Sequence, residues 1–250
     1  MPGFADHFSS LAEGYAAFRP PQSDDVIDYV ASLPARRALV WDCGTGNGQA
    51  AVGLARHFER VVATDASTAQ IAHARPHARI SYVVASAERS AVRSQVADLV
   101  TVAQALHWFD LEQFFAEVRR VAAPGAAVAV WAYGDVTSDN RSLAAVLHDF
   151  TRETVGAYWP PERRIVDDGY RTIPFPFREI HPPSFTLSAR WTLPHLIGYL
   201  RTWSATAAHM RATGTDAVAQ SAPEIAAAWG EPDTAQIVRW PISLRVGFVG

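Results

Sequence analysis

The chain has 250 residues, a hydrophobic fraction of 49% and a net charge of −3 at pH 7, which suits one large α/β domain or a core domain with an insertion. The slight acidity argues against nucleic acid as an obligate partner, because phosphate binding usually shows as basic excess. No apolar run approaches the roughly 20 residues that cross a bilayer, and the single cysteine allows no intramolecular disulfide, so we expect a cytoplasmic protein with no membrane partner.

The first 35 residues are expected to form a helical lead-in. They contain neither a basic nor an apolar segment of the secretory kind, which agrees with the cytoplasmic expectation. Pro20 and Pro21 interrupt the lead-in, and a second helix is expected to begin at Ser23 or Asp24, because acidic residues in the first turn favour a helix start.

From about residue 38 to residue 138, short apolar runs alternate with amphipathic segments. This alternation predicts a parallel sheet with crossover helices on both faces. We expect Pro124-Gly125 to end the last of these helices before the fifth strand. The expected strands are 38–43, 60–65, 80–84, 97–103 and 126–132, and the expected helices are 47–57, 67–75 and 111–122.

The composition changes after about residue 138, where an aromatic and proline-rich stretch no longer fits this alternation. A helix is expected at about 139–155, and a helical region from Pro194 to Trp229 separates two candidate strands near 184–191 and 236–248. Five strand–helix units followed by two widely separated strands predict one sheet with an inserted helical cap. The predicted divisions are a lead-in (1–35), a cofactor-binding core (36–138), a substrate cap (139–235) and a last core strand (236–250).

The most informative segment follows the first expected strand. After Asp42 come three glycines in five positions, Gly44, Gly46 and Gly48, and then a helical pattern. Glycines let the backbone turn tightly and approach a ligand where a Cβ would collide. A second apolar run ends at Asp65, about 20 residues after the first glycine, which is the spacing at which an acidic side chain meets ribose hydroxyls. The segment predicts a pocket for an adenosine-containing cofactor.

The spacing of the glycines separates two kinds of cofactor. The dinucleotide fingerprint is Gly-x-Gly-x-x-Gly, whose third glycine packs close to a pyrophosphate. This chain has Gly-x-Gly-x-Gly, with Gln49 in the last fingerprint position, which favours a cofactor without phosphates; a purely structural turn is the alternative. All 22 basic residues are arginine, which excludes a Walker A lysine and a Schiff-base lysine. Cys43, beside the loop, is expected to be a small buried residue.

The glycine segment resembles motif I of class I S-adenosylmethionine-dependent methyltransferases, with Asp65 in the position of the ribose-binding acidic residue of that family. The lead-in Tyr15-x-x-x-Arg19-Pro20 resembles the segment whose arginine approaches the carboxylate of the cofactor. Residues 104–110, Gln-Ala-Leu-His-Trp-Phe-Asp, resemble the Ala-x-His-Trp-Phe-Asp segment after the fourth strand. The resemblance covers roughly residues 4–135.

The adenine-side segment after the third strand departs from the family pattern. Members commonly have Gly-Asp-Ala-Glu there, whereas this chain has Ala85-Ser86-Ala87-Glu88. The usual side-chain bond to the adenine amino group is therefore in doubt, and recognition would fall to the backbone of Ala87 or the carboxylate of Glu88.

The second half carries a narrower resemblance. Tyr158–Arg163, Asp167–Tyr170 and Pro174–Phe177 are similar to segments of the methyltransferase type 11-like group that includes trans-aconitate methyltransferase-like proteins of yeasts and plant embryo-abundant-type methyltransferases. This likeness supports the architecture more than it names a reactant.

The resemblance implies an α/β, Rossmann-like, doubly wound, seven-stranded sheet, mostly parallel with a C-terminal antiparallel strand, plus the inserted cap. It implies S-adenosylmethionine as cofactor and S-adenosylhomocysteine as product. The cofactor-binding residues that it implies are Tyr15, Arg19, Asp42, Gly44, Thr45, Gly46, Asn47, Asp65, Ala66, Ser86, Ala87, Glu88, Gln104, Ala105 and Trp108.

Methyl transfer from a sulfonium is an in-line displacement, which needs an aligned nucleophile and the exclusion of water rather than a covalent intermediate. His107 is the histidine placed to orient a substrate or act as a general base, with packing as the alternative. Trp108 offers an aromatic face to the sulfonium, with core packing as its alternative. The expected substrate-binding residues are Trp108, Tyr158, Trp159 and Tyr170, within an apolar chamber to which Phe175, Phe177 and Trp203 also contribute.

Two adjacent arginines, Arg163 and Arg164, are either a solvated face or contacts for an acidic substrate. His181, Asp167 and Asp168 lack a metal-ligand spacing, so no metal is expected. The expected function is methyl transfer to a small-molecule acceptor, at an oxygen of a carboxylate or hydroxyl, by a monomer or homodimer. The alternatives are a non-catalytic protein that binds S-adenosylmethionine or S-adenosylhomocysteine, and an NAD(P)-dependent oxidoreductase.

Overall fold

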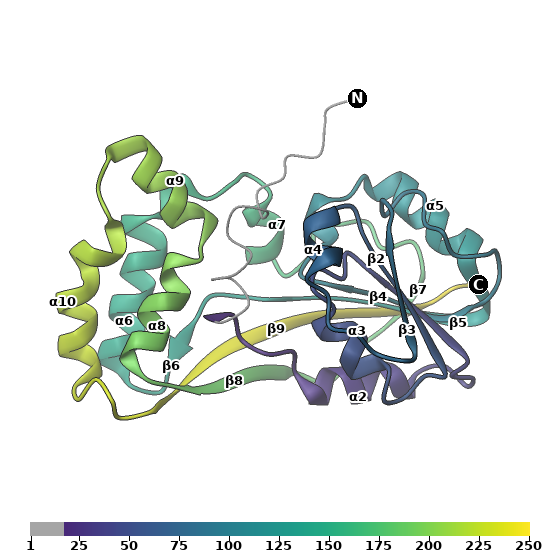
Figure 1. Cartoon of the computed structure of the whole chain (residues 1–250), viewed down its shortest axis with the longest axis horizontal. Coiled ribbons are helices and arrows are strands. Elements are labelled where there is room, and N and C mark those ends of the chain that lie inside the picture. The colour runs from purple at the N-terminus through teal and green to yellow at the C-terminus, as the bar shows by residue number, and fades with distance from the viewer. Residues whose placement is uncertain (1–17) are drawn as a thin grey trace.

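A single mixed sheet runs through the length of the molecule (Figure 1). The computed structural model describes residues 18–250. The parallel part contains, in spatial order, β3 (Ile80–Val84), β2 (Arg60–Asp65), β1 (Leu39–Cys43), β4 (Ala97–Ala103) and β5 (Ala122–Tyr133). The last strand, β9 (Gln236–Phe248), is antiparallel to β5. The expected fold class is therefore confirmed.

The strand β9 organises the second half of the sheet. β5 and β6 (Thr137–Ser138) pair with one of its sides, and β7 (Arg178–Ile180) and β8 (Phe185–Trp191) pair with the other. The sheet of residues 18–250 has nine strands instead of the expected seven. The two extra strands are short and arise because β9 extends past the pairing of β5 at one end and past that of β8 at the other.

Helices cover both faces of the parallel strands, which is why β1 and β4 are buried along nearly their whole length. Val30 of α2 and Leu54 of α3 pack on one face, and Phe114 of α5 packs on the other. Two-sided burial removes the alternation of apolar and polar residues from such strands. The helices of this part are α2 (Asp24–Ser32), α3 (Gln49–Leu54), α4 (Thr68–Ala72), the short 3-10 helix η2 (Leu106–Trp108) and α5 (Leu111–Val121).

Some element boundaries differ from those expected. Helices α3 and α4 are shorter, because the chain leaves each of them through tight turns such as that closed by His57 N donating to the Leu54 carbonyl at 2.9 Å. Pro124-Gly125 does not end a helix. α5 has already ended at Val121, and these two residues lie inside β5, where the pairing with β4 shifts register and Gly125 has a φ of +74°.

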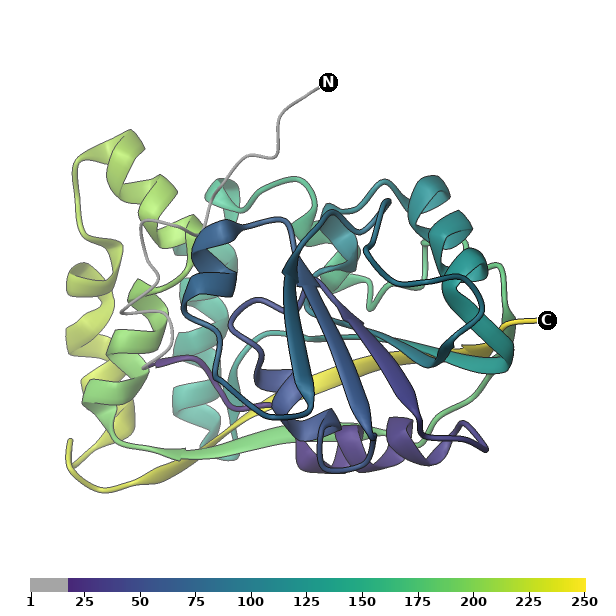
Figure 2. The same ribbon diagram turned by 45° about the vertical axis from the view of Figure 1, so that its right-hand side comes forward.

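The remaining helices gather beyond one end of the parallel strands, and β8 and β9 run out towards them (Figures 1 and 2). The expected helix at 139–155 is α6 continued by a π-helical turn. Most of these helices share a core of their own, with Leu147, Leu200 and Trp240 fully buried in it. The exception is the short helix that carries Val166, which packs in the core beside α5. The remaining helices are α6 (Arg141–Asp149), the π-helix η3 (Phe150–Thr154), the 3-10 helix η4 (Gly156–Tyr158), α7 (Arg163–Asp167), α8 (Leu193–Arg201), α9 (Ser204–Thr213) and α10 (Ala217–Trp229). Within residues 18–250, none of the helices has the length and apolar character that a bilayer crossing requires.

Candidate functional site

The glycine loop joins β1 to α3 at the carboxyl edge of the sheet. Gly44, Gly46 and Gly48 all have a positive φ, of +66°, +56° and +85°. A Cβ on Gly48 would lie 2.2 Å from the hydroxyl oxygen of Tyr82, and one on Gly44 would lie 2.6 Å from the Cβ of Ala105. The loop therefore needs glycine for its conformation and for space.

Asp42 anchors this loop through its buried side chain. Its side chain is fully buried, and it accepts hydrogen bonds from Thr45 Oγ1 at 2.5 Å and Thr101 Oγ1 at 2.8 Å. Burial raises the pKa of Asp42 to about 6, with a smaller contribution from the charge of Asp65. The structure thus places Asp42 beneath the loop, where it ties β1, β4 and the loop together.

Asp65 lies beside the loop, at the end of β2. Its Oδ2 accepts from Gly46 N at 2.8 Å, and its Oδ1 accepts from Ser67 N at 2.8 Å. Asn47 is half-buried in the loop, and Ala66 is exposed next to the carboxylate. The residues expected to meet the ribose and the methionine part of a cofactor are therefore neighbours at one edge.

The segment after β3 reaches the start of α5. Glu88 Oε1 accepts from Asp110 N at 3.1 Å. Ala87 is buried, whereas Ser86 is exposed. The aromatic ring of Phe109, next to Asp110, would meet a Cβ on Gly44 at 3.1 Å. This segment, the end of β4 and the glycine loop consequently surround one region.

Gln104 makes a strained turn directly after β4. It has a φ of +55° although it is not glycine, and such residues concentrate at functional sites. Its N donates to the Trp131 carbonyl at 2.8 Å, and its Oε1 accepts from Tyr133 N at 2.8 Å. These bonds fix the turn to β5, and they set Ala105 against the glycine loop.

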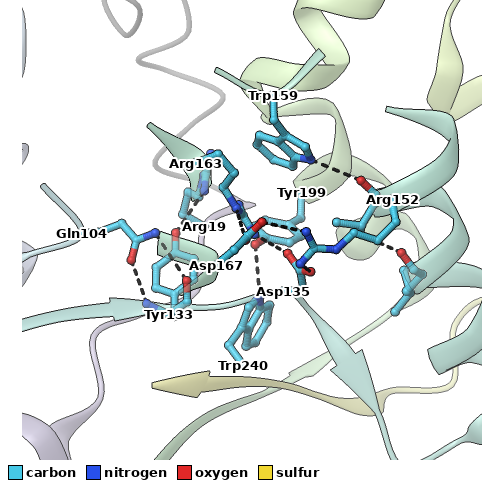
Figure 3. Close-up of polar contacts among 12 residues, drawn as sticks. Arg19, Gln104, Tyr133, Asp135, Arg152, Trp159, Arg163, Asp167, Tyr199 and Trp240 are labelled. Carbon is cyan, nitrogen blue, oxygen red and sulfur yellow. Dashed lines mark hydrogen bonds and ion pairs between the residues drawn. The ribbon is translucent and has the colours of Figure 1, made fainter. Parts of the chain in front are cut away.

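A small pocket, of about 40 Å³, lies where the carboxyl ends of β4 and β5 meet the cap helices (Figure 3). Arg19 spans this junction: Nη1 donates to the Tyr133 hydroxyl at 3.0 Å, and Nη2 donates to the Thr202 carbonyl at 3.2 Å. Its guanidinium lies 5.5 Å from the ring centre of Tyr199. The pocket is lined by Arg19, Gln104, Tyr133, Gly134, Asp135, Trp159, Arg163, Tyr199 and Trp203.

A closed ring of four charges adjoins the pocket, and two of its members, Asp135 and Arg163, line it (Figure 3). Arg152 donates to Asp135 at 2.6 Å and to Asp167 at 2.7 Å. Arg163 donates to Asp167 at 2.7 Å and also pairs with Asp135. The Arg163 guanidinium lies 4.4 Å from the ring centre of Trp159. This charge ring joins the end of β5 to η3 and α7.

His107 lies in η2, immediately after the Gln104 turn. Its Nδ1 is 3.0 Å from the hydroxyl oxygen of Tyr170, and its ring centre is 4.8 Å from that of Trp108. Burial, together with the charge of Arg163, lowers the pKa of His107 to about 4. The imidazole is therefore neutral at pH 7.

Comparison with known proteins agrees with this arrangement. Residues 41–130 match the methyltransferase domain family. A putative methyltransferase of Dictyostelium discoideum is 35% identical over 225 residues, which cover 89% of this chain and 84% of that protein. The structure of a putative type II methyltransferase from Anaeromyxobacter dehalogenans is 44% identical, with a TM-score of 0.89, and covers 93% of this chain and 99% of that one. This chain belongs to the class I S-adenosylmethionine-dependent methyltransferases.

One shorter match is to a protein whose name includes the cofactor. A probable S-adenosylmethionine-dependent methyltransferase of Saccharomyces cerevisiae is 31% identical over 106 residues, which cover 39% of this chain and 36% of that protein. The cofactor that the family implies fits the edge described above, because the loop turns there with three positive φ angles and Asp65 has its carboxylate beside the loop.

Not every residue expected at the site of this methyltransferase lies there. Tyr170 is fully buried, so its side chain supports His107 instead of lining the pocket. Tyr158 packs against His209, with ring centres 4.8 Å apart. Phe175 and Phe177 pack against Phe115 of α5 in the core, so the expectation that they line the chamber is wrong.

Trp159 and Trp203 do line the pocket, whereas Tyr15 lies outside the described residues. Cys43 is buried, as expected. In the part of the chain that the structure describes, no group of three or more His, Cys, Asp or Glu side chains is arranged to hold a metal.

Four pocket residues were not among those expected from the sequence. Tyr133 ends β5, and Gly134 and Asp135 follow it directly, so the rule that strand carboxyl ends share one edge would have found these three. Tyr199 lies on α8, and nothing in the sequence indicates which face of that helix meets the pocket.

Proposed function

We propose that this methyltransferase transfers the methyl group of S-adenosylmethionine to an oxygen, of a carboxylate or hydroxyl, on a small-molecule acceptor. The observation that carries the proposal is that the pocket and the glycine loop lie against neighbouring residues of the turn after β4. Gln104 lines the pocket, and the next residue, Ala105, lies against Gly44 of the loop. A molecule in the pocket is therefore beside a cofactor held by the loop.

The cofactor would be held by the carboxyl edge of β1, β2 and β4. The loop backbone is free to approach it closely, and Asp65 has a carboxylate at the ribose position. When bound, the cofactor supplies an electrophilic methyl group on its sulfonium. The residues that we assign to it are Tyr15, Arg19, Asp42 (through the loop), Gly44, Thr45, Gly46, Asn47, Asp65, Ala66, Ser86, Ala87, Glu88, Gln104, Ala105 and Trp108.

The acceptor would be held by the walls of the pocket. Tyr133, Trp159 and Tyr199 present aromatic surface, which excludes water and suits a partly apolar molecule. Arg19 and Gln104, which we assign to the cofactor, also line this pocket, so the acceptor would lie next to the cofactor.

For this reaction the pocket residues mainly need to align the acceptor with the methyl group and to exclude water. Fixing two reactants in a near-attack arrangement lowers a barrier by about 7–11 kcal/mol at best. Gln104 is fixed by backbone bonds to β5, and Arg163 is fixed by the charge ring. Rigid walls of this kind provide alignment without a covalent intermediate.

A methyl-transfer assay tests the proposal. The full chain is incubated with radiolabelled S-adenosylmethionine and a panel of carboxylic acids and phenols, and label in the extracted organic product is counted. We expect turnover with at least one acid or phenol. The matched control is Trp159→Ala, which removes a pocket wall but no loop residue and should reduce turnover without reducing cofactor affinity.

Thermal denaturation with added ligands separates the alternatives. We expect S-adenosylhomocysteine to raise the melting temperature. Stabilisation by NAD alone would favour an oxidoreductase and overturn the proposal. Stabilisation by S-adenosylhomocysteine with no turnover across the panel would favour a non-catalytic binding protein.

A further inference from the structure

His107, three residues after the pocket residue Gln104, forms a buried pair with Tyr170. Tyr170 has no exposed surface, so its O–H needs an acceptor inside the protein. Burial raises the pKa of the Tyr170 hydroxyl, and the nearby backbone N–H groups of Leu106 and His107 oppose this rise. Those two groups are donors. The acceptor for the Tyr170 proton is therefore His107 Nδ1, at 3.0 Å.

This bond decides which ring nitrogen of His107 carries the proton. A neutral imidazole has one N–H and one acceptor nitrogen, and its partners select the tautomer. Since Nδ1 accepts from Tyr170, the proton lies on Nε2. Among residues 18–250, no group forms a hydrogen bond with Nε2, which is also not a buried unsatisfied atom. Nε2 of His107 is therefore the ring nitrogen available to a ligand, and it acts as a hydrogen-bond donor.

The backbone around Tyr170 is built to hold this pair. Gly169 and Tyr170 have φ values of +63° and +62°, and a tyrosine in the left-handed region is strained. Arg245 of β9 donates from Nη1 to the Tyr170 carbonyl at 2.7 Å, and Tyr170 N donates to the Ile165 carbonyl at 3.0 Å. Arg245 is in turn paired with Glu179 at 2.8 Å. Because these hydrogen bonds hold the strained backbone in place, we infer that the fold fixes the position of the Tyr170 side chain.

We propose that Tyr170 is a positioning residue that locks His107 in the Nε2–H tautomer, so that His107 offers the methyl acceptor a hydrogen-bond donor and not a general base. The inference rests on the proposed function, because it concerns the acceptor of that reaction. A carboxylate has a nucleophilic oxygen that carries no proton, whereas a hydroxyl has to release one. The pair therefore selects acceptors that arrive already ionised, and the Nε2–H stabilises the second carboxylate oxygen.

Nitrogen-15 NMR of histidine-labelled protein tests the lock directly and needs no activity. With His107→Gln used to assign the resonances, we expect the full chain at pH 7 to show His107 as the Nε2–H tautomer. Tyr170→Phe, folded by circular dichroism, should show a mixture of tautomers. Tyr29→Phe, which removes a hydroxyl from α2, is the control and should leave the signals unchanged. An Nδ1–H tautomer, or no change in Tyr170→Phe, would overturn the proposal.

Substitution at His107 tests the donor role. The side-chain amide of His107→Gln has an N–H near the position of Nε2 but cannot act as a base. With a carboxylic acid acceptor we expect its kcat/KM to fall by about 10-fold or less, and that of His107→Ala to fall by about 100-fold, because a hydrogen bond to a charged group is lost. Equal losses in both variants would favour a base. If the wild type transfers no methyl group, the proposed function fails, whereas the NMR result still decides the lock.

Discussion

Asp42 is expected to destabilise the fold at neutral pH while it holds the glycine loop. Its carboxyl group is fully buried, and burial raises its pKa from 3.8 to about 6. Below pH 3.8 the group is protonated in both the folded and the unfolded chain and contributes no difference. Between pH 3.8 and 6 the unfolded chain loses the proton while the folded chain keeps it, so the free energy of unfolding falls as the pH rises. Above about pH 6 this loss is complete.

The size of the effect follows from the two pKa values. The interval from 3.8 to about 6, at about 1.4 kcal/mol per pH unit, gives a destabilisation of about 3 kcal/mol at pH 7. Asp42→Asn has nearly the same shape and no charge to bury. It still accepts a hydrogen bond from Thr45 or Thr101 through its amide oxygen.

Urea unfolding of wild type and Asp42→Asn at pH 4, 5, 6 and 7 measures the effect. We expect the difference in the free energy of unfolding, variant minus wild type, to rise by about 2 kcal/mol between pH 4 and pH 7, because part of the effect is already present at pH 4. Asp25→Asn, at an exposed position in the first turn of α2, is the control for replacing a carboxylate outside the core. A difference that does not change with pH, or that changes in the opposite direction, would refute the reasoning.

Two further experiments test the loop and the charge ring. Gly48→Ala should lower the free energy of unfolding by more than the roughly 1–2 kcal/mol that a left-handed conformation costs, because its Cβ would also meet Tyr82 at 2.2 Å. The control is urea unfolding of Gly125→Ala, which measures the conformational cost alone because Gly125 has a φ of +74° and no atom within 4 Å of the added Cβ. Equal losses in the two variants would contradict the steric argument. A double-mutant cycle of Asp135→Ala and Arg163→Ala should give a coupling of about 1–2 kcal/mol in the same assay, because the two side chains are only 25% and 16% exposed and belong to a network. The control pair, Asp139 and Arg239, is exposed and should couple much more weakly, so an equal coupling would show that the charge ring has no special role.

The parallel half of the fold was predictable because its signals are local. Buried strands are continuous apolar runs, and the positions of β1 to β4 agree with the expected ranges to within one residue. The start of β5 was not predictable in the same way, because its first residues, up to Gly125, form a bulge that depends on the pairing with β4. Likewise β6 and β7 form only because β9 extends beyond the stretches that pair with β5 and β8, and its remaining backbone groups are free to pair with them.

The candidate site likewise has a part that local sequence signals predict and a part that only the fold brings together. The glycine loop and Asp65 follow from spacing, because close backbone approach and an edge carboxylate require those residue types. The charge ring joins residues from 135 to 167 with no fixed spacing, so only the fold brings them together. Tyr170 illustrates the remaining difficulty. An aromatic residue after Asp-Gly suits a pocket wall or a buried support equally, and its hydroxyl bond to His107 is visible only in the structure.

Calorimetric titration of S-adenosylhomocysteine into wild type and Asp65→Ala is the most direct test of the central claim, that the carboxyl edge around the glycine loop holds the cofactor of a methyltransferase. We predict that the wild type binds and that the variant binds more weakly by at least about 1 kcal/mol, because the ribose hydroxyls lose a charged acceptor. Ser67→Ala, which removes a hydroxyl that caps α4 but keeps the carboxylate, should bind nearly as the wild type does. No binding by the wild type, or unchanged affinity in a folded Asp65→Ala, would contradict the claim.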